Sequence, residues 1–82
     1  MKRLTEFGKA KYILSLLKDK AGITIEHDDQ PHKICLVYRG FDFDLDYKAK
    51  IIQPAVGTQN IAIYAIAELL TIMYNELYTN NE

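Results

Sequence analysis

The sequence predicts one α+β domain spanning residues 1–82, with both helices on one face of a three-stranded antiparallel meander, in the order α-β-β-β-α. Three observations support this fold. Residues 41–47 alternate apolar and acidic side chains without a break, as a half-buried strand does. Turn-forming residues, at 28–31 and at Arg39 and Gly40, separate this stretch from two earlier alternating stretches. Apolar residues recur with helical spacing towards both ends of the chain.

The length and composition fit a small globular domain. Eighty-two residues can enclose a single core, and 49% apolar with 26% charged residues is an ordinary globular composition. The single cysteine, Cys35, excludes an internal disulfide and favours a reducing compartment, so we expect a cytoplasmic protein. The first residues include Glu6, Lys9 and Lys11 where a signal peptide would have an apolar run.

The first helix is predicted from about Thr5, a suitable N-cap, to about Lys20, just before Gly22. Its apolar side consists of Phe7, Ile13, Leu14, Leu16 and Leu17. Charge is unevenly distributed along the chain. Residues 1–20 carry six basic and two acidic side chains, a net +4, whereas residues 21–50 carry −2 and residues 51–82 carry −3. We therefore expect a basic helix and an acidic sheet.

The three strands are predicted at residues 23–27, 32–38 and 41–47. A four-residue turn at 28–31 and a two-residue turn at 39–40 let residues be paired outward from each turn. Three inward-facing rows result: Ile23, Leu36 and Phe43; Ile25, Ile34 and Leu45; His27, His32 and Tyr47. Two outward-facing rows are Thr24, Cys35 and Asp44, and Glu26, Lys33 and Asp46. Both turns place the apolar residues on one face, which favours this register because a one-residue slip would expose them.

The last helix is predicted from Thr58 or Asn60 to about Tyr78, after a segment, 48–57, that prolongs the third strand until Pro54 and Gly57 break it. Only Tyr64, Glu68, Thr71 and Asn75 form a compact polar stripe on this helix. The remaining apolar surface is wider than one sheet can cover. It must therefore contact the first helix, a second copy of the chain or another protein. We predict self-association with Ala65, Leu69 and Ile72 near the interface. Glu68 and Glu76 argue against a membrane span.

The acidic row on the third strand is a candidate binding face. Asp42, Asp44 and Asp46 point to one side of the strand, with Glu26 across the sheet, and could meet a basic protein partner. A divalent metal is a weaker reading, because the aspartates are about 7 Å apart along a strand and no glycine-containing loop wraps them. A solvated face, with Lys33 pairing to Asp46 and Glu26, is the plainest alternative.

Catalytic chemistry finds little support. His27 and His32, with Asp28 and Asp29 nearby, could in principle bind zinc, but a partly buried, hydrogen-bonded role is commoner for histidines at the end of an apolar face. Acid beside Cys35 should raise the pKa of its thiol, which disfavours a nucleophile. No GxSxG, phosphate loop, HExxH or CxxC motif occurs. We expect no catalysis, no metal and no cofactor.

The predicted architecture resembles that of double-stranded-RNA-binding domains. The segment 30–33 (QPHK) before the second strand and the alanine-rich segment 61–67 (IAIYAIA) at the start of the last helix are similar to that family's loop and second helix. The family contacts phosphates with lysines at the N-terminus of that helix. This chain has the uncharged Gly57, Thr58, Gln59 and Asn60 there, so the resemblance implies the architecture and not RNA binding.

These observations predict a small non-enzymatic domain that binds a protein and forms a homo-oligomer, without a membrane or nucleic-acid partner. Its size and surface are similar to those of phage and mobile-element accessory proteins that bind and inhibit a host protein. The alternative is a nucleic-acid-binding regulator that uses the lysines of the first helix, which would show salt-dependent binding. A small enzyme using His27 and His32 is a third class, and it would require bound metal.

Overall fold

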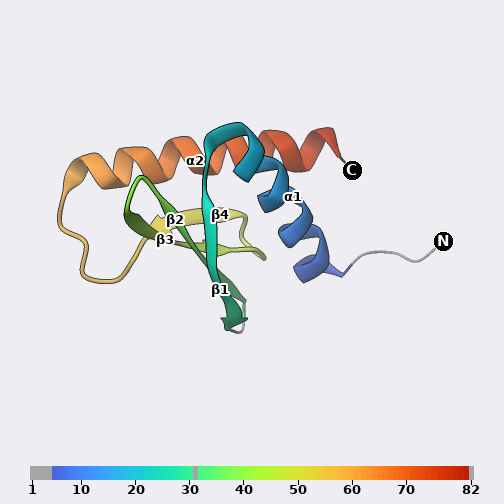
Figure 1. Cartoon of the computed structure of the whole chain (residues 1–82), viewed down its shortest axis with the longest axis horizontal. Helices are drawn as coiled ribbons and strands as arrows, with labels where there is room; N and C mark the ends of the chain where they lie inside the picture. The colour runs from blue at the N-terminus through green and yellow to red at the C-terminus, as the bar shows by residue number, and fades with distance from the viewer. Residues whose placement is uncertain (1–4, 31, 82) are drawn as a thin grey trace.

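The computed structural model describes the backbone of residues 5–30 and 32–81, and the side chains of these residues except those of 27–30. In chain order the elements are α1 (Glu6–Ala21), β1 (Thr24–Gln30), β2 (Lys33–Tyr38), β3 (Phe41–Asp46), β4 (Ile51–Pro54) and α2 (Ile61–Asn80) (Figure 1). The α+β class is confirmed. The sheet differs from the prediction, because it has four antiparallel strands in the order β1-β2-β3-β4.

Both helices begin at residues with capping side chains. The Thr5 hydroxyl accepts a hydrogen bond from the Gly8 N–H at 2.9 Å, and α1 ends at Gly22, whose φ of 82° lies in the left-handed region. The Gly22 N–H donates to the Lys18 carbonyl, as in a glycine C-cap. The Asn60 amide oxygen accepts from the Ala62 N–H at the start of α2. The predicted helix starts are therefore confirmed.

The predicted register between β2 and β3 is also confirmed. Leu36 pairs with Phe43, and Cys35 pairs with Asp44. The connecting turn consists of Arg39 and Gly40, with φ values of 53° and 83°. Two consecutive residues with positive φ are typical of a type I′ hairpin turn, whose twist matches that of the strands it joins.

The predicted register between β1 and β2 is wrong by two residues. Ile25 pairs with Leu36 and not with Ile34, because β1 continues through the expected turn to Gln30, which pairs with Lys33. Irregularities on either side of His27 absorb the difference, as β-bulges do. At Thr24 and Ile25 the shift is two residues, which keeps these side chains on their predicted faces, so Ile23 is still buried and Ile25 partly buried. At His27, which pairs with Cys35, the shift is three residues.

The fourth strand was missed. Residues 51–54 neither prolong β3 nor form a loop, but turn back and pair with it, Ile52 opposite Leu45 and Gln53 opposite Asp44. Asp46 supports the turn, since its Oδ1 accepts hydrogen bonds from the N–H groups of Lys48 and Ala49, both at 3.1 Å. Pro54 ends β4, the edge strand of the sheet, a position where proline costs no ladder hydrogen bond.

Both helices contribute to one hydrophobic core, together with one face of the sheet. α1 contacts α2, and α2 packs beside β4 (Figure 1). The buried core residues are Ala10, Ile13, Leu14, Leu17, Ile23, Ile34, Leu36, Phe43, Leu45, Ile52, Ile63, Ala67, Leu70 and Tyr74. On β2 and β3 these residues alternate with outward-facing ones, so the described side chains of the opposite face lie outside the core.

The open edge of β4 is covered by polar side chains of α2. The Thr71 hydroxyl accepts from the Ile52 N–H at 2.9 Å and lies 3.1 Å from the Ile52 carbonyl oxygen and 2.8 Å from the Ala67 carbonyl oxygen. Its single hydrogen can be donated to either carbonyl. The Asn75 amide donates to the Lys50 carbonyl at 2.8 Å. The side chains of Thr71 and Asn75 thus take the place of a further strand that would otherwise pair with β4.

Replacing Thr71 with valine keeps the shape of the side chain but removes the hydroxyl. We expect the free energy of unfolding to fall by about 1–2 kcal/mol, because the Ile52 N–H loses its partner at a half-buried position. Urea denaturation followed by circular dichroism measures the change. The matched control is Thr79→Val on the exposed end of the same helix, which should change stability by less than about 0.5 kcal/mol. Equal effects of the two substitutions would contradict this role of Thr71.

Candidate protein-binding surface on α2

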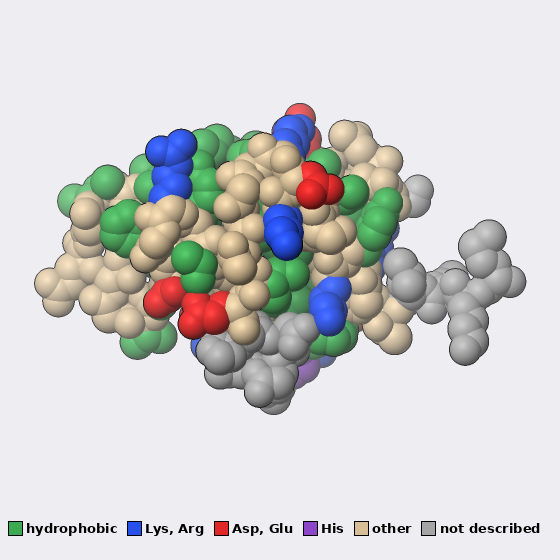
Figure 2. Space-filling model, viewed as in Figure 1, with side chains coloured by type: hydrophobic (Ala, Val, Ile, Leu, Met, Phe, Trp, Pro, Cys, Tyr) green, Lys and Arg blue, Asp and Glu red, His purple; other side chains and the backbone are tan. Residues whose placement is uncertain are grey.

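An apolar stripe runs along the solvent side of α2. It consists of Ile61, Ala65, Leu69 and Ile72, and we call it the α2 stripe. Ile61, Leu69 and Ile72 are 83%, 57% and 61% exposed, large fractions for aliphatic side chains of this size. By helical periodicity the stripe lies opposite the buried residues Ile63, Ala67, Leu70 and Tyr74. Figure 2 shows hydrophobic side chains gathered over the N-terminal half of α2, at the upper left of the view.

A groove of about 820 Å³ adjoins the stripe, between α2, β4 and the segment 55–57. Its lining includes Ile51, Pro54 and Val56 on one side and Ile61, Tyr64 and Ile72 on the other. Glu68 is the only charged residue among the described residues that line it. Val56, on the segment that leads to α2, is 95% exposed. An apolar groove next to an apolar stripe is a surface suited to burial against another protein.

Only Tyr64 and Glu68 of the predicted polar stripe of α2 are exposed. Thr71 and Asn75 are half-buried against β4, and the Tyr64 hydroxyl donates to the Thr58 carbonyl at 3.0 Å. Part of the predicted apolar surplus, Ile66, Met73 and Leu77, is partly buried against the core. The rest is the α2 stripe. The sequence therefore identified Ala65, Leu69 and Ile72 as surplus surface, and the structure places all three in solvent.

The groove was not predicted from the sequence. Ile51 and Val56 line it, yet neither has a periodic pattern that marks it as a site residue. Their position depends on β4, which was missed. One signal for the turn before β4 was present in the sequence. Asp46 is followed by Tyr47, Lys48, Ala49 and Lys50, and aspartate commonly begins such turns.

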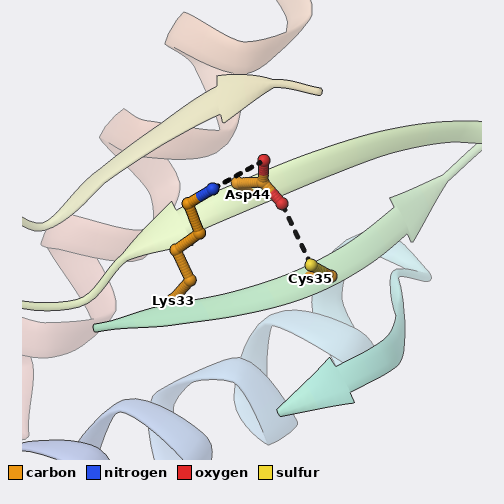
Figure 3. Close-up of polar contacts among 3 residues, drawn as sticks. All are labelled: Lys33, Cys35 and Asp44. Carbon is orange, nitrogen blue, oxygen red and sulfur yellow. Dashed lines mark hydrogen bonds and ion pairs between the residues drawn. The ribbon is translucent and has the colours of Figure 1, made fainter. Parts of the chain in front are cut away.

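The acidic row on β3 is bonded within the protein. The Asp44 carboxylate accepts a hydrogen bond from the Cys35 thiol at 3.0 Å and lies 3.9 Å from the Lys33 ammonium (Figure 3). Asp46 accepts the two N–H groups of the following turn. Lys33 was predicted to pair with Asp46 and Glu26, and its ammonium is within ion-pair distance of the diagonal neighbour Asp44. Asp42 and Glu26 are exposed on the outer side of the sheet.

The hydrogen bond to Asp44 sets the chemistry of Cys35. This bond, followed by burial and by the negative charge of Asp44, raises the pKa of the Cys35 thiol from 9.0 to about 11. The predicted rise is thus confirmed. A thiol with this pKa is almost entirely protonated at neutral pH, which makes it a poor nucleophile and a poor metal ligand.

The two histidines are not opposite each other. His27 pairs with Cys35, because of the irregular register of β1, while His32 precedes β2 with a φ of 63° and its ring lies 6.4 Å from that of Tyr47. The side chains of His27, Asp28 and Asp29 lie outside the described residues, so the zinc site considered and not favoured from the sequence is not described as a whole. Among the side chains that are described, no three His, Cys, Asp or Glu residues are grouped closely enough to hold a metal ion.

By length and mean hydropathy alone, α2 could cross a membrane. This is weak evidence, since a helix of a protein core meets the same criteria. The hydrogen bonds from Thr71 and Asn75 to β4 and the burial of Tyr74 show how α2 is used in this fold, as a helix packed on a sheet.

Comparison of the chain with models of protein families, with curated proteins and with solved structures gives no match. The expected resemblance to double-stranded-RNA-binding domains is limited by β4, which adds a fourth strand to the α-β-β-β-α order. The α2 stripe and its groove are therefore supported by the exposure and chemistry of their own residues alone.

Removing the Asp46 carboxylate should destabilise the fold more than changing Asp42. We expect Asp46→Ala to lower the free energy of unfolding by about 1 kcal/mol, because two turn N–H groups lose their acceptor. Asp42→Asn is the matched control on the same strand face and should lie within about 0.5 kcal/mol of the wild type. Chemical denaturation of the two variants compares them directly, and a larger loss for Asp42→Asn would show that the turn contacts contribute little.

The raised pKa of Cys35 predicts slow alkylation. At pH 8 the folded protein should react with iodoacetamide far more slowly than the urea-unfolded chain, since the thiolate fraction is roughly 100-fold smaller. Folding stability should fall as the pH rises from about 9 towards 11, because the unfolded thiol ionises first. Asp44→Asn should increase the alkylation rate, as measured by mass spectrometry. An unchanged rate in that variant would assign the protection to burial alone.

Proposed function

We propose that this protein is a non-enzymatic protein-binding domain, and that the α2 stripe with its adjoining groove is the binding surface. The observation that supports this most directly is the distribution of exposed large apolar residues. Among the described side chains, six of the eight lie on α2 or around the groove, namely Ile51, Val56, Ile61, Tyr64, Leu69 and Ile72. The other two, Tyr12 and Phe41, lie elsewhere on the chain. Contiguous exposed apolar surface of this kind is a feature of protein interaction sites.

The acidic face of the sheet is the second candidate surface for a protein partner. Asp44 and Asp46 already serve the fold through the Cys35 thiol and the turn N–H groups, which accounts for two of the three aspartates without a partner. Asp42, Asp46 and Glu26 are exposed, and a basic partner could act on them, chiefly by raising the rate of encounter.

The biological setting is a separate proposal. A small domain with an exposed apolar surface and, among its described residues, no cluster that could hold a metal ion suits an accessory protein of a phage or mobile element that binds a host protein and modulates or inhibits it. This proposal is based on an analogy of size and surface.

Nucleic-acid binding through α1 is the alternative, and two of the described lysines of α1, Lys9 and Lys11, are held on aromatic rings. The Lys9 ammonium lies 4.3 Å from the centre of the Tyr78 ring, and the Lys50 ammonium lies 4.6 Å from the same centre. Lys11 lies 5.6 Å from the centre of the Phe7 ring. Cations held on aromatic rings of the domain are less available to phosphates. Binding that weakens steeply with salt in a mobility-shift assay would promote this alternative.

A charged residue on the α2 stripe should abolish partner binding. We expect proteins that co-purify with the tagged wild type from native cells, including an untagged copy of the chain, to be lost with Leu69→Glu, because a carboxylate would be buried in the apolar contact. Quantitative mass spectrometry measures the loss.

The matched control is Tyr12→Glu, which places the same charge at a position of similar exposure on α1 and should retain the partners. Asp42→Asn should also retain them. Partners that survive Leu69→Glu but are lost with Asp42→Asn would move the binding site to the acidic face. An absence of any partner dependent on Leu69 would contradict the proposed function.

A further inference from the structure

Building on the proposed function, we propose that the α2 stripe binds a second copy of this chain, with the two α2 helices antiparallel about a two-fold axis between Ala65 and Leu69. Two features of α2 favour this arrangement: the order of small and large residues along the helix, and the positions of its two glutamates.

The solvent side of α2 has heptad spacing. The residues at intervals of three and four are Ala62, Ala65, Leu69, Ile72, Glu76 and Thr79, and every one is exposed. These positions correspond to a and d of a coiled-coil heptad, which form the seam between two helices. They follow one another over the full length of α2, a helix of 20 residues and about 30 Å.

Side-chain size along this seam favours the antiparallel arrangement. The two small residues, Ala62 and Ala65, lie in the N-terminal half, and the two large ones, Leu69 and Ile72, follow them. In an antiparallel pair Leu69 lies opposite the second copy's Ala65, and Ile72 lies opposite its Ala62. Each layer then combines one large and one small side chain and can be filled evenly. A parallel pair in register would instead place alanine against alanine in two layers and large residues together in the other two.

Glu76 gives an independent electrostatic argument. In a parallel pair it would face its own copy across the seam, and α2 contains no lysine or arginine to compensate the two charges. In the antiparallel pair it lies beyond the first residue of the second copy's α2, next to the cap at Asn60. That helix start has no acidic residue in its first turn. A carboxylate there is stabilised by the positive end of the helix dipole.

Glu68 should weaken the antiparallel dimer. It flanks the seam near the proposed two-fold axis, so it approaches the Glu68 of the second copy. Two like charges at this place weaken the antiparallel pair at neutral pH. In a parallel pair the same residue would lie beside Met73 of the other helix, where its charge has no counterpart. The two glutamates therefore respond to neutralisation with opposite signs in the antiparallel dimer.

The segment before α2 extends the contact. Val56 and Ile61 are 95% and 83% exposed, and in the antiparallel pair they lie towards the C-terminal half of the second copy's α2. This adds apolar area on both sides of the two-fold axis. Such an extension is needed, because a specific interface usually buries at least about 1,000 Å² in total.

Sedimentation velocity and equilibrium on the full chain test the proposal. We expect a dimer whose dissociation constant falls with Glu68→Gln and rises about 3- to 30-fold with Glu76→Gln, since each dimer contains the Glu76 contact twice. Ala65→Glu should give a monomer. Glu6→Gln, an exposed change on α1, is the matched control and should leave the dissociation constant unchanged.

Cross-linking in a Cys35→Ser background gives a second measurement. A mixture of the Ala65→Cys and Leu69→Cys proteins should form mixed disulfides in preference to either protein alone, because these two positions lie opposite each other in the antiparallel pair. Circular dichroism confirms that each variant is folded before it is scored.

Three outcomes would overturn the proposal. The dimer is parallel if Glu76→Gln lowers its dissociation constant, Glu68→Gln leaves that constant unchanged, and each cysteine protein forms disulfides alone. A dimer that survives Ala65→Glu uses another surface. A wild type that stays monomeric to millimolar concentration excludes the second copy. In that last case a different protein lost with Leu69→Glu would leave the proposed function intact, whereas no such protein would remove both.

Discussion

The hydrogen bonds between Thr71 and Ile52 fix how α2 is rotated on the sheet. Because the Thr71 hydroxyl satisfies the outward N–H of the edge strand, the polar side of the helix has to face β4. The adjacent side carries Ile63, Ala67 and Leu70 into the core. Only the side opposite the core is left for solvent, and by helical periodicity that side carries Ile72. The exposed apolar surface is therefore a consequence of using the polar residues to cover a strand edge.

The same arrangement restricts how a partner can bind. An edge strand usually offers its free backbone groups to another strand. Here Asn75 binds the Lys50 carbonyl, Thr71 binds Ile52, and Pro54 has no N–H to offer. A strand added at β4 would therefore have to displace the contacts of Thr71 and Asn75 and would find no N–H at Pro54. The surface that remains next to this edge is helical and apolar, so side-chain packing has to provide most of the affinity of any partner bound there.

Local signals in the sequence predicted the parts of the fold that depend on neighbouring residues. Thr5, Gly22 and Asn60 marked helix ends, and Arg39 with Gly40 fixed the β2–β3 register, because a two-residue turn leaves one way to pair the strands. The β1–β2 register was wrong because the strands turn after Gln30 and not at residues 28–31, and because bulges beside His27 are not encoded in the alternation of apolar residues. β4 was not predicted, because a strand of four residues that ends in proline is too short to be identified by periodicity.

The sequence pointed to two candidate surfaces, the acidic row on β3 and the apolar side of α2, and the contacts in the structure support them unequally. The alternation of residues 41–47 correctly places three aspartates on one face, but alternation cannot show that Asp44 accepts from Cys35 and Asp46 from its own turn. Those bonds give the carboxylates a role inside the domain. No comparable internal role exists for Leu69, since an exposed leucine gains no free energy until something covers it. Exposed apolar surface that the fold leaves uncovered is thus stronger evidence for a partner than a row of charges that the fold already uses.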